Sequence, residues 1–144
     1  MTNVPRIVSW RRGDPPEQLV RREWIVTNAL GGYASGTLAG VATRRYHGLL
    51  IAALPAPLGR FVMLNHLQER LVVDEKSFHL SGGEPMQGEL VLPELTLMHE
   101  FRLENGLPVW HFENERIRLT KRLVMSHLLN VTWLTYTLDA GSRS

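Results

Sequence analysis

Short segments rich in β-branched and aromatic residues recur along this chain, and no segment shows a sustained helical period. Most segments end at Gly, Pro, Asn or Ser, and they recur at a spacing of roughly 8–12 residues, which is typical of folds made of many short strands. We therefore predict an all-β fold, an antiparallel β-sandwich. The predicted strands are residues 23–27, 46–54, 61–64, 69–73, 78–80, 89–92, 96–103, 109–113, 116–125 and 131–138.

Three local patterns are more specific. Asn105 and Gly106 separate two alternating segments, and this dipeptide favours a tight β-hairpin because both residues tolerate a positive φ. The run 46–54 becomes continuously apolar, which predicts a strand covered on both faces. In the strand 116–125 apolar residues alternate with arginines, and Lys121 is predicted to break that register.

The two ends of the chain carry separate expectations. Residues 1–22 are predicted to be a solvent-exposed leader, because they are rich in arginine and Pro15-Pro16 disfavours a helix. Residues 23–144 would form the sandwich domain. Because the chain stops soon after the strong strand 131–138, we expect a sandwich that is incomplete at its C-terminus, with an exposed edge at this strand.

Composition excludes several classes of function. There is no cysteine, which rules out disulfides and thiolate metal sites, and the histidines lack metal-ligand spacing, so we expect no metal and no cofactor. Sixteen basic residues oppose fourteen acidic ones, a net charge of +2 that does not indicate a nucleic-acid partner. No apolar run is long enough to span a bilayer and no signal peptide begins the chain, so we expect a cytoplasmic protein without membrane contact.

The most unusual part of the chain is the glycine-rich segment, residues 28–48. Gly31 and Gly36 have the spacing of a phosphate-binding loop, but Thr37 stands where the lysine that neutralises phosphate charge is needed. A dinucleotide fingerprint also fails, because Tyr33 occupies the place of its second glycine. A nucleotide site is therefore disfavoured.

Two other interpretations of the segment remain. In a structural one, its tyrosines are core aromatics, its arginines form a solvated corner and its histidine holds a backbone carbonyl. In a functional one, it contacts a sugar, since amide and guanidinium groups bind hydroxyls and aromatic rings stack on the C–H face of a pyranose.

A family resemblance favours the sugar interpretation. The runs EWIVTNALGGYASGT, residues 23–37, and TRRYHGLLIAA, residues 43–53, resemble the N-terminal domain of bacterial and archaeal-type glycogen debranching enzymes, the amylo-α-1,6-glucosidases. Ala29 stands where that family usually has glycine. The resemblance implies a large, supersandwich-like β domain that precedes an α/α-toroid carrying the hydrolytic carboxylates.

The resemblance also implies the partners: an α-glucan such as glycogen, limit dextrin or maltooligosaccharide, and the catalytic toroid in cis or in trans. Glycoside hydrolysis needs two facing carboxyls, and the acidic residues here lie in no distinctive motif, so we predict no catalytic residue in this chain. The expected substrate-binding residues are Asn28, Gly31, Gly32, Tyr33, Ser35, Arg44, Arg45, Tyr46 and His47.

Each of these residue types has an expected role. Arg44 or Arg45 would donate to sugar hydroxyls or fix a partner carboxylate, and Tyr33 or Tyr46 would stack on a glucose ring. His47 would make one hydrogen bond, and the glycines would allow close backbone approach. In the alternative, the same surface docks the catalytic domain and has no sugar affinity of its own. We also expect possible self-association through the exposed edge strand.

Overall fold

The computed structural model describes residues 8–82 and 96–140. In this part of the chain it contains eleven β-strands and a single four-residue helix, so the all-β prediction is confirmed. The strands form a five-stranded sheet, a four-stranded sheet and a two-stranded hairpin, and all of the pairings between strands are antiparallel. The predicted strand 89–92 lies outside the described residues.

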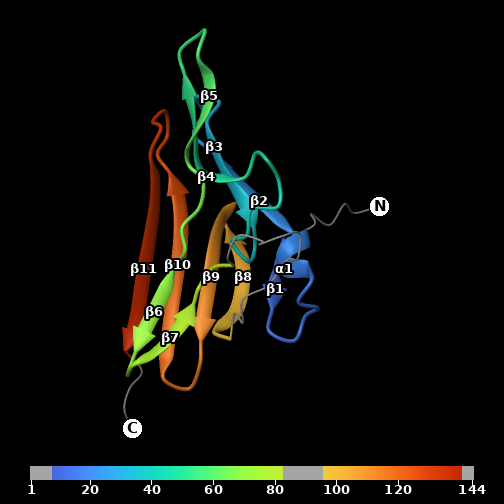
Figure 1. The fold of residues 1–144 in the computed structure, drawn as a ribbon, viewed down its shortest axis with the longest axis vertical. Helices are drawn as coiled ribbons and strands as arrows, with labels where there is room; N and C mark the ends of the chain where they lie inside the picture. The colour runs from blue at the N-terminus through green and yellow to red at the C-terminus, as the bar shows by residue number, and fades with distance from the viewer. Residues whose placement is uncertain (1–7, 83–95, 141–144) are drawn as a thin grey trace.

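The five-stranded sheet is built mainly from the second half of the chain. Its order is β1-β8-β9-β10-β11 (Figure 1), with the bounds β1 Trp10–Arg11, β8 Met98–Glu104, β9 Leu107–Glu113, β10 Ile117–Met125 and β11 Thr132–Ala140. Asn105 and Gly106 connect β8 to β9 with φ of 51° and 80°. The predicted Asn-Gly hairpin is therefore confirmed, and its left-handed backbone explains why these two residue types occupy it.

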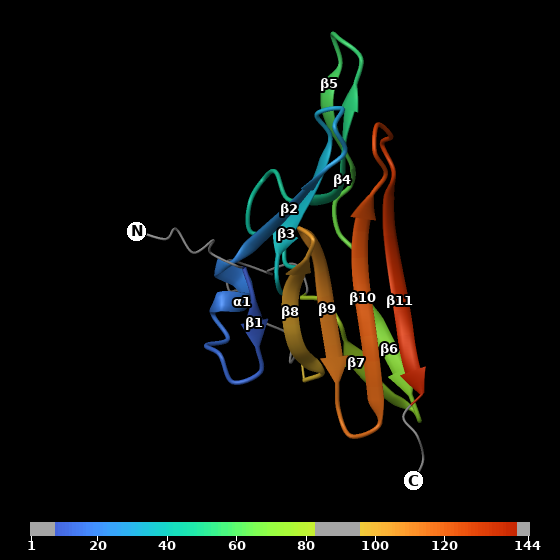
Figure 2. The same cartoon turned by 180° about the vertical axis from the view of Figure 1, so that it is seen from behind.

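The four-stranded sheet and the small hairpin come from the first half. The sheet order is β2-β3-β4-β5, with the bounds β2 Glu23–Thr27, β3 Tyr33–Thr37, β4 Gly48–Leu54 and β5 Gly59–Leu64. The hairpin consists of β6 Arg70–Val73 and β7 Lys76–His79. Figures 1 and 2 show the β4–β5 hairpin projecting beyond the five-stranded sheet, while β6 and β7 lie beside β10 at its other end.

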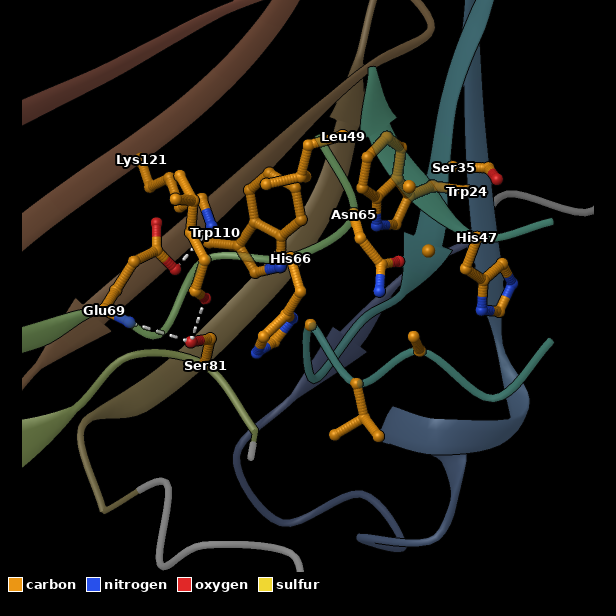
Figure 3. A pocket seen from close by; sticks show the side chains of 16 residues that line it. Trp24, Ser35, His47, Leu49, Asn65, His66, Glu69, Ser81, Trp110 and Lys121 are labelled. Atoms are coloured by element: carbon orange, nitrogen blue, oxygen red, sulfur yellow. Dashed lines mark hydrogen bonds and ion pairs between the residues drawn. The ribbon is translucent and has the colours of Figure 1, made fainter. Parts of the chain in front are cut away.

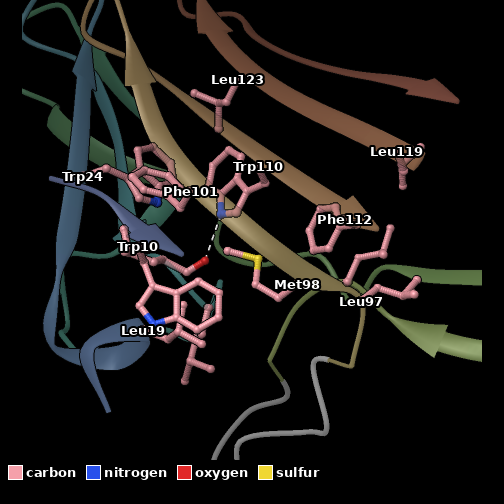
Figure 4. Close-up of a cluster of buried hydrophobic side chains, with 14 of the residues drawn as sticks. Trp10, Leu19, Trp24, Leu97, Met98, Phe101, Trp110, Phe112, Leu119 and Leu123 are labelled. Carbon is pink, nitrogen blue, oxygen red and sulfur yellow. Dashed lines mark hydrogen bonds between the residues drawn. The ribbon is translucent and has the colours of Figure 1, made fainter. Parts of the chain in front are cut away.

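The core lies between the five-stranded sheet and the first-half strands. Trp110 of β9 sits at its centre, edge-on to Trp24 at 5.6 Å and to Phe101 at 5.2 Å between ring centroids. Its indole N–H donates to the carbonyl oxygen of Leu38 at 2.8 Å (Figure 4), which ties the two sheets together. Such edge-to-face aromatic contacts add packing energy to the burial of apolar area.

Two predicted elements differ from the structure. No strand is predicted between residues 27 and 46, yet Tyr33–Thr37 forms strand β3, which pairs with β2 and β4. A Cβ at Gly36 would lie 3.4 Å from the ring of Trp24, an ordinary van der Waals contact, so the packing of this ring does not by itself require glycine. β4 begins at Gly48, two residues later than predicted, and only part of it is fully buried.

Lys121 does not break the register of β10, and this prediction was wrong. The burial of the strand alternates regularly, and Lys121 points into the interior with the apolar residues. Its ammonium donates to Glu69 Oε2 at 2.8 Å and lies 4.7 Å from the ring centroid of Trp110. A buried cation is tolerated at this apolar position because a carboxylate and an aromatic face compensate its charge.

Residues 8–22 pack closely on the sandwich. Trp10 of β1 and Leu19 of the helix α1 (Gln18–Arg21) are 6% and 5% exposed and belong to the core. Arg11, Arg12 and Arg21 are exposed, as expected. The prediction of a solvent-exposed leader is wrong for Trp10 and Leu19, which are buried. A strand of two residues and a helix of one turn are too short to show a periodic pattern, so neither could be predicted from periodicity.

Candidate functional site

An open groove crosses the outward face of the four-stranded sheet. Tyr33 and Ser35 point outward from β3, while Ala34 and Gly36 face the opposite side. Along the sheet, Tyr33 pairs with Ile51 of β4, which in turn pairs with Val62 of β5. The residues lining the groove are Leu30, Gly31, Tyr33, Arg45, Tyr46, Ile51, Ala53, Leu54, Gly59, Arg60 and Val62.

Two arginine–tyrosine pairs flank this groove. The guanidinium carbon of Arg45 lies 6.0 Å from the ring centroid of Tyr46, and that of Arg60 lies 5.9 Å from the ring centroid of Tyr33. Arg60 Nε also donates to the carbonyl oxygen of Gly31 at 2.7 Å, which fixes its position. Tyr46 is 68% exposed. The groove thus presents two aromatic rings and two cations together.

Two hydrogen bonds hold the backbone of Tyr46 in place. The hydroxyls of Tyr33 and Ser35 donate to its carbonyl oxygen at 3.2 Å and 3.3 Å. A second, smaller hollow on the same face lies over β2 and β3 and shares Tyr33 and Tyr46 with the groove. The exposed ring of Tyr46 therefore borders two neighbouring hollows, an arrangement that suits a ligand longer than one ring.

His47 lies behind this surface and is only 4% exposed. Its Nδ1 accepts hydrogen bonds from the backbone N–H groups of Thr43 at 3.1 Å and Arg44 at 3.3 Å, so it carries no proton. Nε2 lies 3.4 Å from Glu23 Oε1, so a carboxylate faces the other side of the ring. Burial lowers the pKa of His47, against the opposing effect of Glu23. Both ring nitrogens face groups of the protein, so His47 positions the turn that carries Arg44 and Tyr46.

Arg44 is exposed, but its guanidinium is engaged. Its Nε donates to Glu23 Oε1, the same oxygen that faces His47. Glu23 thereby links β2 to the Arg44–His47 turn, in which His47 N–H donates to the Arg44 carbonyl at 3.1 Å. The two adjacent arginines consequently differ: Arg44 braces the turn and Arg45 borders the groove.

Asn28 is 1% exposed and forms the centre of what we call the turn junction, where the β2–β3 turn meets the β10–β11 turn. Its Oδ1 accepts from the N–H groups of Leu30 and Gly32, both at 3.0 Å. Its Nδ2 donates to the carbonyl of Leu129 at 3.0 Å and to Asn130 Oδ1 at 3.1 Å. The amide is fully used inside the protein, so Asn28 shapes the groove without lining it.

The glycines explain why the turn junction is tight. A Cβ on Gly32 would lie 2.7 Å from Asn28 Nδ2 and 2.9 Å from the carbonyl oxygen of Ile51, distances that no real side chain tolerates. Gly31 has a φ of 94° and Ala29 one of 66°, both in the left-handed region that favours glycine. The backbone conformation accounts for the usual glycine at the position of Ala29.

Sequence reasoning missed two groups of residues. Arg60 and Leu30 line the groove, yet neither stands out in the sequence, because only the β4–β5 pairing brings Arg60 beside Tyr33. The second group is the buried ion pair of Glu69 and Lys121, to which the exposed Tyr136 is joined because its hydroxyl donates to Glu69. A lysine at an apolar position of an alternating strand was the signal that could have identified this cluster.

A cavity of about 30 Å³ lies between the sheets above this cluster. Figure 3 shows it bordered by Trp24, Trp110 and His66, with Lys121 and Glu69 at one side. Ligand pockets for small molecules have volumes of roughly 300–1,000 Å³, so this cavity is too small to hold a sugar. The open groove on the outward face is the better candidate for ligand binding.

Neither a metal-binding cluster nor a membrane-spanning helix is found in the described residues. Within residues 8–82 and 96–140, no group of three or more His, Asp or Glu side chains is arranged to hold a metal ion. In the same part of the chain, no helix is long and apolar enough to cross a membrane.

Comparison with known proteins gives one finding. A family model described as glycogen debranching enzyme N terminal matches residues 22–144. No curated protein matches the chain, and no solved structure matches it. The matched region includes the groove and the smaller hollow on the outward face of the four-stranded sheet, the turn junction and all of β11.

Proposed function

We propose, for a chain that belongs to the glycogen debranching enzyme N-terminal family, that the groove on the outward face holds glucose units of an α-glucan branch. Hydrolysis of the α-1,6 bond would be carried out by a separate catalytic domain. The observation that carries the proposal is the pairing of two tyrosine rings with two arginines in one groove whose eleven described lining residues include no carboxylate.

Each feature of the groove matches a feature of a sugar. Tyr46 offers an exposed ring on which the C–H face of a pyranose can stack, and the guanidinium of Arg45 can donate to sugar hydroxyls. In the described residues, Arg45 and Arg60 form no ion pair with a carboxylate. No carboxylate of this part of the chain therefore competes with a sugar for either guanidinium. None of the described residues that line the groove is a carboxylate, which fits a domain that holds substrate without cleaving it.

Calorimetry with maltooligosaccharides and a branched limit dextrin tests this function. We expect the wild-type chain to bind, Arg45→Ala to lose most of the affinity, and Arg70→Ala, which removes an exposed arginine on β6, to bind like the wild type. Binding should depend weakly on salt, since the sugar is neutral. Equal affinity of Arg45→Ala and wild type, or no binding by a folded sample, would contradict the proposal.

One observation favours a second candidate, docking of the catalytic domain. Every residue of β5 except its last is exposed, and the β4–β5 hairpin carries four large apolar side chains in water: Leu58, Phe61, Val62 and Met63. Exposed apolar patches of this kind often mark interaction surfaces. A chain that fails to bind glucan but restores activity when added to an isolated catalytic domain of the family would support docking.

A further inference from the structure

The two edges of the five-stranded sheet differ in length and charge. β1, at one edge, has two residues and includes Arg11, with Arg12 directly after it. β11, at the other edge, has nine residues, and no other strand in the described part of the chain pairs with its outer side. Short, charged edges resist pairing with another chain, whereas long, uncharged ones favour it. β1 is therefore protected and β11 is open.

The side chains of β11 increase this difference. From Thr132 to Leu138 the strand reads TWLTYTL, with neither a charge nor a proline. Trp133, Tyr136 and Leu138 are 59%, 45% and 57% exposed, on both faces of the sheet. None of the usual devices that blunt an edge is present before Asp139. Both the backbone and the side chains of β11 are suited to accept another strand.

We propose that β11 pairs antiparallel with β11 of a second copy of this chain, about a two-fold axis at Thr135. In this register Tyr136 faces Leu134 of the other copy, and Trp133 faces Thr137, both favourable cross-strand pairs. Asp139 faces Val131, so no like charges meet. The strand is therefore complementary to itself, and the two five-stranded sheets join into one.

The unequal edges also decide between a closed dimer and a fibre. If β11 paired with β1 of the next copy, the contact would repeat without closing and could grow into filaments. β1 offers only two residues to such a contact. Pairing of β11 with itself uses up the open edge in both copies, so assembly stops at two chains.

The size of the contact sets its strength. A nine-residue strand is about 30 Å long, and an edge-to-edge contact of this length buries less than the roughly 1,200 Å² of a stable interface. We therefore expect a reversible dimer whose population rises with protein concentration. Main-chain hydrogen bonds provide most of the affinity, as in other cases of strand addition.

The test uses charge at the proposed two-fold axis. Thr135 is exposed, so Thr135→Lys and Thr135→Glu should leave the fold intact, as circular dichroism can verify. Each variant places two like charges directly opposite one another across the axis, which should weaken dimerisation by about tenfold or more. Val72→Lys, a substitution at an exposed strand position on β6, is the matched control and should dimerise like the wild type.

Sedimentation velocity over a concentration series gives the readout. We expect dimers for the wild type and Val72→Lys, monomers for each Thr135 variant alone, and restored dimers when Thr135→Lys and Thr135→Glu are mixed, since opposite charges then face each other. A wild type that stays monomeric at all concentrations overturns the proposal. So does a wild-type dimer that both Thr135 variants leave unchanged, or a mixture of the two variants that remains monomeric.

Discussion

The interior of the sandwich and the groove on its outward face use polar residues in opposite ways. Inside, Asn28 and Lys121 are 1% and 6% exposed, and each has hydrogen-bond partners within the protein. In the groove, Tyr46 is 68% exposed, and Arg45 contacts its ring without a carboxylate partner among the described residues. The comparison teaches that a buried polar group holds the fold, whereas an exposed and uncommitted one is available to a ligand.

The glycine-rich segment contains both kinds of residue within about twenty positions. His47 and Tyr46 are neighbours in sequence, yet one lies behind the surface with both nitrogens engaged and the other stands out from it. Substitutions in the interior should therefore change stability, and substitutions in the groove should change binding. Four predictions test this division, from the largest expected effect to the smallest.

The largest effect is expected for the buried ion pair. Lys121→Ala leaves Glu69 buried without its cation and should lower the free energy of unfolding by about 3–5 kcal/mol, measured by urea denaturation. Burial lowers the pKa of Lys121 more than Glu69 raises it, so the ion pair offsets only part of the cost of burying the charge. The double variant Lys121→Met with Glu69→Gln should therefore recover much of the loss. A double variant as unstable as the sum of its single changes would contradict this.

Asn28→Ala is expected to follow. It removes the acceptor for two backbone N–H groups and the donor that reaches Leu129, and it should cost about 2–3 kcal/mol because buried donors lose their partner. Thermal unfolding measures the loss. Ala29→Gly, at the neighbouring exposed position with a φ of 66°, is the control and should not destabilise the chain. Asn28→Ala with wild-type stability would show that the turn junction does not hold the two turns together.

His47 should give a smaller effect that depends on pH. Its pKa is lowered in the folded state, chiefly by burial, so the unfolded chain binds the proton more readily. The contribution of His47 is therefore fully present above the unfolded pKa near 6.5 and is lost as the pH falls through the lower, folded value. Denaturant midpoints between about pH 8 and pH 5 should fall more steeply for the wild type than for His47→Gln. Parallel curves would refute the assignment.

The smallest effect on stability is expected in the groove. Tyr46→Ala should change the free energy of unfolding by no more than about 0.5 kcal/mol, because the exposed ring packs little, while glucan binding is lost. Tyr46→Phe should retain stacking and hence most of the binding, since the ring remains. Calorimetry and urea denaturation on the same samples give both quantities. If Tyr46→Ala unfolds as readily as Asn28→Ala, the groove is part of the core and the division fails.

The sequence predicted the strands well and the burial of polar residues less well. Nine predicted strands, from 23–27 to 131–138, overlap strands of the structure over most of their length, because alternation and turn residues are local signals. Strand β3 and the interior position of Lys121 were missed. Both depend on other segments of the chain: β3 on its pairing with β2 and β4, and Lys121 on Glu69, fifty-two positions away.

The sequence alone determined that this chain is an all-β protein with an Asn-Gly hairpin, and its motif over residues 23–53 indicated its family. Only the tertiary structure decided which residues of the glycine-rich segment face water. Asn28 is buried because the β10–β11 turn, 101 residues away, closes over it, and Arg60 reaches the groove because β5 pairs with β4. Local patterns specify strands because they depend on neighbouring side chains, whereas exposure depends on which distant segments fold against each other.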